Sequence, residues 1–425
     1  VVETILVTFA ITKIVDKLAD KFKYVLIYAM LFAGMVVGIC SCGSGKVNQG
    51  SDSMRGVVAD SFDSLFSELF PNEDEPGAIV VVMRGDSIVY NRAFGLANMA
   101  SEDAINDSTL FNLSSASKIF TAAALLKLCE QGEITLDDSL AMYFPEFTGE
   151  FFKHITIRHI LTHSSGLPDV RPRNGEEWDK YLSNHKSIFV HEKDYTLYGK
   201  EDEHMLVFQN LESAEYDAGA HYNRQDPAYI LVAPLIERVT GQGFDQWMET
   251  NIFSPSGMKE AFYYTPGFKM PKAAHGYRRV EQGNKALSFR SEDGKWEEYD
   301  FGEAPFFLTK ADRGVYASAR DFMQWNRALY SGKIISDSLL SMMYMPYIQT
   351  DIPMVGFGLG TAVKTEPGFP PKAYHLNANG GFAIVEGSWP SKRLHYIVFS
   401  NRNDWDRRAV NNSIDSIFKV KGCLE

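Results

Sequence analysis

Runs of apolar and β-branched residues predict strands near the start of the folded part of the chain. Residues 77–83 and 87–94 are rich in β-branched and aromatic side chains, and they flank the turn-forming residues 84–86. Two such runs joined by a short glycine-containing turn are typical of a β-hairpin. An amphipathic pattern over residues 57–70, just before this hairpin, predicts a helix.

Helical periodicity dominates the middle of the chain, and strand-like runs return near its end. Residues 115–258 show mainly helical patterns with glycine and proline between them. Residues 382–389 and 395–401 are predicted strands, and residues 408–420 a final helix. Strands at both ends with helices between them predict one antiparallel sheet built from the two termini.

The first 42 residues differ from the rest of the chain. Lys21 and Lys23 precede an uncharged run at residues 24–39, and residues 40–42 are Cys-Ser-Cys. A basic region, an apolar region and small residues in this order predict an export signal. The apolar run is shorter than the ~20 residues that a spanning helix needs, which makes an uncleaved membrane anchor the weaker alternative.

Residues 39–42 resemble a bacterial lipobox, with an aliphatic residue three positions before Cys42 and a small residue just before it. Cys42 is therefore the predicted lipidated N-terminus, and plain cleavage nearby is the alternative. Residues 1–42 would form the leader, in which residues 1–20 look like extra upstream sequence. The small polar residues 43–53 would form a tether. These features predict an exported bacterial lipoprotein, periplasmic or on the cell surface, whose lipid anchor makes the membrane a partner.

The composition is that of a globular protein, with 45% hydrophobic and 23% charged residues in a chain of 425. The net charge is -12, and no basic cluster is present. This argues against nucleic acid as a partner, because neutralising phosphates needs concentrated Lys and Arg. The four cysteines show no Cys-x-x-Cys spacing, and there is no nucleotide-binding loop. We therefore expect neither a metal nor another cofactor.

Ser115 and Lys118 are the candidate catalytic pair. A polar, serine-rich stretch is followed by the apolar residues 122–126, which predicts a serine-capped helix beginning near Ser115. A spacing of three residues puts both side chains on one helical face. A desolvated lysine with a lowered pKa can take the proton of a serine hydroxyl and activate it as a nucleophile. A helix cap beside a solvated surface lysine is the plainer alternative.

The Ser115 motif is one of several ordered blocks that together resemble a known family. The other blocks are Pro76-Gly77-Ala78, Arg92-Ala93-Phe94-Gly95, Gly132-Glu133-Ile134-Thr135-Leu136, Thr162-His163-Ser164-Ser165-Gly166-Leu167-Pro168, Ile236-Glu237-Arg238-Val239-Thr240-Gly241, Ser256-Gly257-Met258, Gly314-Val315-Tyr316-Ala317-Ser318 and Gly356-Phe357-Gly358-Leu359-Gly360. With Ser-x-x-Lys, they make residues 76–403 similar to the serine β-lactamase and penicillin-binding-protein superfamily. The resemblance is to its class C β-lactamase-related branch, which includes D,D-peptidases, D-aminopeptidases and esterases.

This resemblance implies a fold and an activity. The fold is β-lactamase/transpeptidase-like, an α/β (α+β) arrangement in which a helix-flanked antiparallel sheet from both termini joins a mainly helical subdomain. Residues 54–425 would form it, with the sheet subdomain at 54–110 and 259–425 and the helical subdomain at 111–258. The activity is that of a serine hydrolase that forms an acyl-enzyme on Ser115.

The second catalytic motif of the family, Tyr-x-Asn, is altered here. Without an alignment gap, Arg224-Gln225-Asp226 fall at its place; with a local shift, Tyr222 takes the tyrosine position and Arg224 stands where asparagine belongs. The resemblance implies proton transfer by Tyr222 in the second alignment, and substrate contacts for Arg224 and Asp226. Tyr222 could instead only pack the loop, and Asp226 could act as a base if burial raised its pKa.

The third motif, Lys-Thr-Gly or His-x-Gly in the family, corresponds to His375-Leu376-Asn377. The resemblance implies that His375 binds a ligand or holds a proton near neutrality. Asn377 replaces a glycine, so its side chain would reshape the substrate groove. The N–H groups of Ser115 and Ala378 would form the oxyanion hole.

Two tempting alternatives are set aside. Lys364-Thr365-Glu366 lies too close to the Gly-Leu-Gly block to begin the site strand, so we interpret it as a decoy. His163 beside Ser164 suggests a triad, but in this family the block is structural.

The leading hypothesis is an exported, lipid-anchored serine hydrolase. Its substrate would be a peptidoglycan-type D-amino acid peptide, a β-lactam or a small ester, and the histidine in the third motif disfavours an efficient β-lactamase. The alternative is a non-catalytic ligand-binding protein of the same fold, with degenerate second and third motifs.

Overall fold

The computed structural model describes residues 49–168, 205, 208–224, 226–263, 272–279, 295–300 and 309–425. The chain divides into two compact units, Val1–Gly50 and Ser51–Glu425, and the second contains all the described strands. The predicted leader and Cys42 lie outside the described residues. Within the described ranges, no helix combines the length and the hydrophobicity needed to span a bilayer.

Eight described strands form the main sheet, in the order β10-β11-β12-β13-β14-β15-β1-β2, and all neighbours are antiparallel. They are β1 (Ala78–Arg84), β2 (Ser87–Phe94), β10 (Ile348–Gln349), β11 (Val355–Phe357), β12 (Ala362–Lys364), β13 (Lys372–Asn379), β14 (Phe382–Trp389) and β15 (Leu394–Ser400). Because β1 pairs with β15, strands from both ends of the chain meet inside one sheet. The predicted sheet is confirmed, and its four predicted strands agree with the observed bounds to within one residue.

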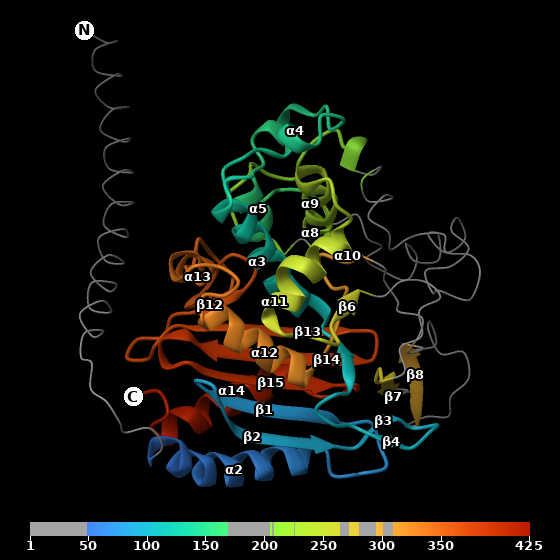
Figure 1. Cartoon of the computed structure of the whole chain (residues 1–425), viewed down its shortest axis with the longest axis vertical. Helices are drawn as coiled ribbons and strands as arrows, with labels where there is room; N and C mark the ends of the chain where they lie inside the picture. The colour runs from blue at the N-terminus through green and yellow to red at the C-terminus, as the bar shows by residue number, and fades with distance from the viewer. Residues whose placement is uncertain are drawn as a thin grey trace. The chain divides into compact units, whose positions relative to one another are not determined.

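Helices cover both faces of this sheet (Figure 1). They are α2 (Gln49–Leu69) and α14 (Arg407–Val420) on one face, and α3 (Ser117–Glu130) and α12 (Ala319–Tyr330) on the other. Successive strand residues point to opposite faces, so Val80 joins the α2/α14 core and Ile79 the α3/α12 core. The two predicted terminal helices are confirmed, and α2 starts early enough to include residues 49–53, which the sequence assigned to the tether.

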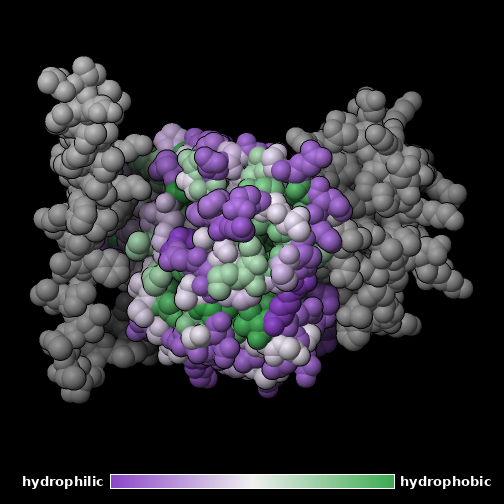
Figure 2. Space-filling model, turned by 90° about the horizontal axis from the view of Figure 1, so that it is seen from above, coloured by the Kyte–Doolittle hydropathy of each residue, from purple (hydrophilic) through white to green (hydrophobic). Residues whose placement is uncertain are grey.

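Short helices make up the subdomain above the sheet in Figure 1. The described ones are α4 (Leu140–Tyr143), α5 (Ile157–Leu161), α8 (Asp226–Ile230), α9 (Val232–Thr240), α10 (Phe244–Met248) and α11 (Ser254–Ser256), with the 3-10 helix η2 (Glu150–Lys153) and the π-helix η3 (Glu249–Phe253). Nearer the sheet are α13 (Asp337–Met343) and the 3-10 helices η1 (Ser114–Ala116) and η4 (Pro390–Lys392). Seen from above, the described surface mixes hydrophilic and apolar residues (Figure 2).

Three small sheets complete the described part. They are β3 (Leu96–Asn98) with β4 (Asp103–Ala104), β5 (Leu110–Asn112) with β9 (Val315–Ser318) and β6 (Phe262–Tyr263), and β7 (Gly276–Arg279) with β8 (Trp296–Asp300). The β5–β9 pair matters for the site, because β5 leads directly into η1 and β9 follows the segment around Asp312. Residues about 200 positions apart in sequence are thereby brought together.

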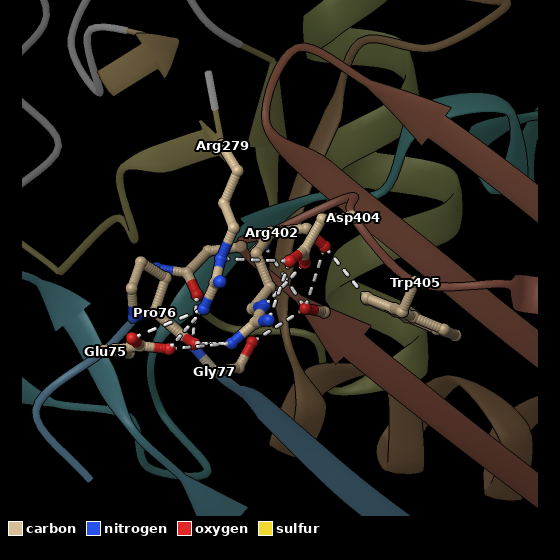
Figure 3. Close-up of polar contacts among 9 residues, drawn as sticks. Glu75, Pro76, Gly77, Arg279, Arg402, Asp404 and Trp405 are labelled. Atoms are coloured by element: carbon tan, nitrogen blue, oxygen red, sulfur yellow. Dashed lines mark hydrogen bonds and ion pairs between the residues drawn. The ribbon is translucent and has the colours of Figure 1, made fainter. Parts of the chain in front are cut away.

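A network of arginines and carboxylates, shown in Figure 3, ties β7 to the ends of β1 and β15. Arg402 is buried and donates from Nε and Nη2 to the two carboxylate oxygens of Asp404, at 2.7 and 2.8 Å. Arg279, at the end of β7, donates to Glu75 at 3.0 Å, and the indole of Trp405 donates to the Arg402 carbonyl at 3.0 Å. The carboxylate of Asp404 thus compensates for the cost of burying the charge of Arg402.

Candidate active site

The turn that carries Ser115 is held in an unusual backbone conformation. Ser114 has a φ of +51°, a left-handed conformation that non-glycine residues rarely adopt. The side-chain Oδ1 of Asn112 accepts the N–H of Ser114 at 2.9 Å and stabilises this turn. Ser115 follows in η1 and is buried. The predicted helix start is confirmed, but no serine caps η1 or α3; the hydroxyl of Ser117 accepts the N–H of Val315 at 3.1 Å instead.

Lys118 lies one turn further on and is only 2% exposed. Its Nζ donates to the main-chain carbonyl of Asp312 at 3.1 Å and lies 5.3 Å from the centre of the Tyr229 ring. The hydroxyl of Tyr229 donates to the Leu161 carbonyl at 2.6 Å, which holds that ring in place. The burial contradicts the plainer interpretation of Lys118 as a solvated surface lysine.

The segment before β9 fixes the first turn of α3, a role that the sequence did not reveal. Besides the Asp312 carbonyl that binds Lys118, the Ala311 carbonyl accepts the hydroxyl of Thr121 at 2.6 Å. A Cβ at Gly314 would lie 2.7 Å from the carbonyl oxygen of Thr309, so the tight path of this segment requires glycine. Main-chain acceptors leave no side-chain signature, and Gly314 is the one signal in the sequence that could have pointed here.

Strand β13 runs beside this turn. It pairs with β12 from Lys372 to Tyr374, and with β14 as far as Asn379. Helix η1, which carries Ser115, packs against both β13 and β14. Ala378 lies near the end of β13 and is exposed. The structure therefore brings the two predicted oxyanion residues to neighbouring elements, and their role as donors stays a prediction.

His375 is buried on β13, and both of its ring nitrogens bind protein groups. Nε2 lies 2.7 Å from the Gly360 carbonyl, and Nδ1 lies 3.0 Å from a carboxylate oxygen of Glu386. A carbonyl oxygen only accepts hydrogen bonds, so Nε2 of His375 must carry a proton. The contact between Nδ1 and Glu386 requires a second proton, which lies either on Nδ1 or on the carboxyl group. This arrangement gives His375 a positioning role, and its contact with a ligand or its holding of a proton near neutrality stays a prediction.

What His375 positions is the glycine loop beneath Lys118. Gly360 has a φ of +87°, and a Cβ there would lie 3.0 Å from the Lys118 carbonyl oxygen and 2.8 Å from the Ala122 Cβ. Its N–H donates to the Leu161 carbonyl at 3.0 Å. The loop is therefore pressed against α3 and needs glycine in this conformation.

Tyr222 lies on the loop that precedes α8. Its ring is 5.3 Å from that of Phe357 and 6.0 Å from that of His163. The N–H of Asn223 donates to the His163 carbonyl at 2.9 Å. Tyr222 thus belongs to an aromatic cluster that packs the loop, as the packing alternative expects, and its catalytic role stays a prediction. His163 occupies the centre of this cluster, in agreement with the structural role assigned to its block.

Arg224 and Asn377 form a bridge between this loop and β13. The Nη2 of Arg224 donates to the side-chain oxygen of Asn377 at 2.9 Å. Arg224 is exposed, and Asn377 is 4% exposed. The two predicted substrate-binding residues are therefore neighbours in space, although 153 positions separate them in sequence.

Two further predictions concern Asp226 and the Lys364 motif. Gln225 and the side chain of Asp226 lie outside the described part of the chain, so the substrate contact or base role of Asp226 stays a prediction. Lys364 ends β12, and its amine pairs with Glu366 at 3.1 Å and with Asp415 on α14 at 3.6 Å. These contacts lie on the α14 side of the sheet, which agrees with the interpretation of Lys364-Thr365-Glu366 as a decoy.

Comparison with known proteins agrees with this geometry. Penicillin-binding protein 4* of Bacillus subtilis (strain 168) is 26% identical over 345 residues, or 80% of this chain and 71% of that protein. A D-aminopeptidase of Brucella anthropi is 28% identical over 189 residues, or 44% of this chain and 32% of that protein. Esterase EstB of Burkholderia gladioli is 29% identical over 212 residues, or 48% of this chain and 51% of that protein.

Solved structures and a family profile extend the match over most of the chain. The penicillin-binding protein homologue from Pyrococcus abyssi has the same fold, with a TM-score of 0.70 at 21% identity over 85% of this chain and 77% of that one. This confirms the predicted β-lactamase/transpeptidase-like fold. The Beta-lactamase profile matches residues 62–417. The chain therefore belongs to the Beta-lactamase family, a family of serine hydrolases that act on amides and esters.

Proposed function

We propose that this chain is an exported serine hydrolase that works through an acyl-enzyme on Ser115. The observation that carries the proposal is the burial of Lys118 one helical turn after Ser115, with its amine bound by the Asp312 carbonyl. Burial favours a neutral amine over an ammonium ion, and a neutral amine can act as a base. The serine and its base would then lie beside β13, the strand that carries Ala378.

The proposed reaction has two balanced steps. Ser115 Oγ attacks the acyl carbon while its proton passes to the amine of Lys118, and the main-chain N–H groups of Ser115 and Ala378 stabilise the oxyanion. The bond to the leaving amine or alcohol then breaks, and that group takes the proton from Lys118. Water attacks the ester carbon next, releasing the acid and restoring the Ser115 hydroxyl.

The proposed substrates are D-amino acid peptides of the peptidoglycan type, β-lactams and small esters. The names of the relatives, a penicillin-binding protein, a D-aminopeptidase and an esterase, support this range. The third motif differs from Lys-Thr-Gly in both His375 and Asn377, and His375 is engaged by Gly360 and Glu386. We therefore consider efficient hydrolysis of β-lactams the least favoured of the three activities.

Covalent labelling of the full chain tests the nucleophile. A fluorophosphonate probe and a labelled penicillin should each modify the protein, and Ser115→Ala should abolish the modification. Ser338→Ala, a change of the same kind at an exposed position on α13, should leave it intact. Label that persists in Ser115→Ala would overturn the assignment of the nucleophile.

A ligand-binding protein without turnover is the second candidate. It is favoured by the packing of Tyr222 in an aromatic cluster and by the engagement of both nitrogens of His375. Hydrolysis of a 4-nitrophenyl ester by the purified protein, absent in Ser115→Ala, would exclude this candidate. A raised melting temperature with a penicillin, without label or turnover, would support it.

Export and lipid anchoring are part of the proposal and rest on residues 21–42 of the sequence. In a bacterial host, the full chain should incorporate a labelled fatty acid and fractionate with membranes. Cys42→Ala should lose the fatty acid, whereas Cys129→Ala, which changes a cysteine inside the folded unit, should keep it. Equal incorporation in both variants would overturn the assignment of Cys42.

A further inference from the structure

Glu386 is a buried carboxyl group that the proposed reaction does not use. It lies on β14, directly across the strand pair from His375, and it is 8% exposed. Its Oε2 lies 3.0 Å from Nδ1 of His375. Burying a carboxyl group is costly unless other groups form hydrogen bonds with it, so a glutamate at this position calls for an explanation.

Hydroxyl groups lie close to this carboxyl group. Ser388, two residues further along β14, points to the same face, and its Oγ lies 3.1 Å from the hydroxyl of Tyr330 at the end of α12. That hydroxyl donates to the hydroxyl of Tyr344 at 3.2 Å. Burial raises the pKa of both tyrosines, and the charge of Glu386 raises it further. The carboxyl group thus belongs to a polar cluster between the sheet and the end of α12.

Glu386 determines which nitrogen of His375 carries a proton. Nε2 donates to the Gly360 carbonyl, 2.7 Å away, and so must be protonated. With Glu386 at Nδ1, this proton stays in place whether the carboxyl group donates to Nδ1 or the carboxylate accepts from it. Without a partner at Nδ1, a neutral imidazole can carry its single proton on Nδ1 instead. Nε2 would then face the Gly360 carbonyl with one acceptor against another.

From Gly360, a series of contacts leads to the catalytic pair. The N–H of Gly360 donates to the Leu161 carbonyl at 3.0 Å, and the hydroxyl of Tyr229 donates to the same oxygen at 2.6 Å. The ring of Tyr229 lies 5.3 Å from Nζ of Lys118. A Cβ at Gly360 would lie 3.0 Å from the Lys118 carbonyl oxygen, so the loop and α3 are in direct contact. A shift of Gly360 would therefore reach Lys118 both through Tyr229 and through α3.

We propose that Glu386 is a positioning residue for the reaction at Ser115. By keeping the proton on Nε2 of His375, it fixes the Gly360 loop. The loop in turn holds Lys118 where its amine can take the proton of Ser115. The inference rests on the proposed function and adds to it a residue that acts through His375 and Gly360, not on the substrate.

Two substitutions of Glu386 test this role. Glu386→Leu removes the partner of Nδ1, so kcat for a 4-nitrophenyl ester and the rate of labelling by a fluorophosphonate should both fall by about 10- to 100-fold, the equivalent of one lost hydrogen bond to a charged group. Glu386→Gln keeps a donor, because its amide N–H can bind Nδ1 and leave the proton on Nε2. This variant should stay close to the wild type in both rates. Equal losses in the two variants would overturn the role.

A double variant shows whether Glu386 acts through His375. His375→Leu removes the donor to Gly360 and should lower kcat as much as Glu386→Leu does. The two changes together should lose no more than His375→Leu alone, because both break the same series of contacts. Losses that multiply would contradict the proposal. Asp415→Asn, which changes another buried carboxyl group, on α14, should leave the kcat of the folded fraction unchanged.

The ring of His375 gives a readout that does not depend on turnover. In Ser115→Ala protein with isotope-labelled histidine, nitrogen NMR identifies the His375 signals by their loss in His375→Leu. Nε2 should be protonated with Glu386 and with Glu386→Gln. With Glu386→Leu, signals of an unprotonated Nε2 and a protonated Nδ1 should appear. A tautomer that does not change in Glu386→Leu would also overturn the proposal.

These measurements separate the role of Glu386 from the proposed function. If the wild type and Glu386→Leu react with the ester and the probe alike, the positioning role is wrong and the hydrolase stands. If the wild type shows neither label nor turnover but the tautomer still depends on Glu386, the hydrolase falls and the fixing of the Gly360 loop by Glu386 stands.

Discussion

Two lysines are buried on opposite faces of the main sheet, and their surroundings differ. Lys118, on the α3 side, donates to a main-chain carbonyl and faces an aromatic ring. Lys372, on the α14 side, binds the carboxylate of Asp415 and the side-chain oxygen of Asn411, the latter at 2.8 Å. A carboxylate partner stabilises the ammonium form of a lysine and so opposes the effect of burial, which favours the neutral amine. Burial alone therefore does not identify a catalytic lysine; the partner does.

The surroundings of Lys372 are those of a structural ion pair. Its amine also lies 5.0 to 5.4 Å from the centres of three rings, those of Tyr374, Trp389 and Tyr396. Burial lowers the pKa of Lys372 to about 8, against the opposing effect of Asp415, which raises it. Contacts of this kind fix β13 against α14.

Replacing each lysine by methionine should separate the two roles. Lys118→Met removes the base, so ester hydrolysis and probe labelling should fall by about 10²- to 10⁴-fold. Lys372→Met should leave the kcat of the folded fraction close to that of the wild type. The measurement is kcat on protein whose folded fraction is checked by circular dichroism. Similar losses in both variants would mean that the contrast between the lysines is wrong.

The order of the effects on stability should be the reverse. Lys372→Met removes the nearer positive charge that compensates the buried carboxylate of Asp415. This loss should lower the free energy of unfolding by about 3 kcal/mol. The variant Lys372→Met with Asp415→Asn removes both charges and should recover part of that loss. Urea unfolding of the two variants measures the difference, and Lys118→Met should lose less than Lys372→Met. A double variant no more stable than Lys372→Met would contradict the ion pair.

The pH dependence of stability sharpens the same contrast. The pKa of Lys372 is about 8 in the folded chain, chiefly through burial, against 10.5 as its ordinary value. Between these values the unfolded chain binds more protons, so the contribution of Lys372 to stability rises with pH, by on the order of 1 kcal/mol per pH unit. We expect the stability of the wild type relative to Lys372→Met to rise from pH 8 to pH 10. A flat or falling difference would contradict this environment.

Local patterns were enough to predict much of the fold. The hairpin of β1 and β2 and the strands β14 and β15 follow from runs of apolar and β-branched residues and from short turns, which act between neighbours in sequence. The start of α3 follows from the polar stretch before an apolar helix. The Ser115 motif could be assigned for the same reason, because its two side chains belong to one helical turn.

The rest of the site depends on contacts that a sequence does not display. The Asp312 carbonyl that binds Lys118 is main chain, and almost 200 residues separate the two. The bridge from Arg224 to Asn377 joins two residues whose identities depart from the family motifs, so the motifs could not pair them. His375 was expected to bind a ligand or to hold a proton near neutrality because a histidine stands in that motif, and no sequence pattern indicated the contact with Glu386 on the neighbouring strand.

The smallest expected effect belongs to Lys364, the lysine of the decoy motif. Its amine is partly exposed and pairs with Glu366 and Asp415, so Lys364→Ala should change the free energy of unfolding by less than about 1 kcal/mol. Hydrolysis should be unchanged, because the contacts of Lys364 lie on the face of the sheet opposite to Lys118.

The charge of Lys364 lowers the pKa of Lys372. Removing that charge should therefore move the rise in stability that Lys372 causes to higher pH. Lys419→Ala, which removes another partner of Glu366, is the matched control. A loss of hydrolysis in Lys364→Ala alone would assign the third motif to Lys364-Thr365-Glu366 and place a catalytic lysine on the α14 side.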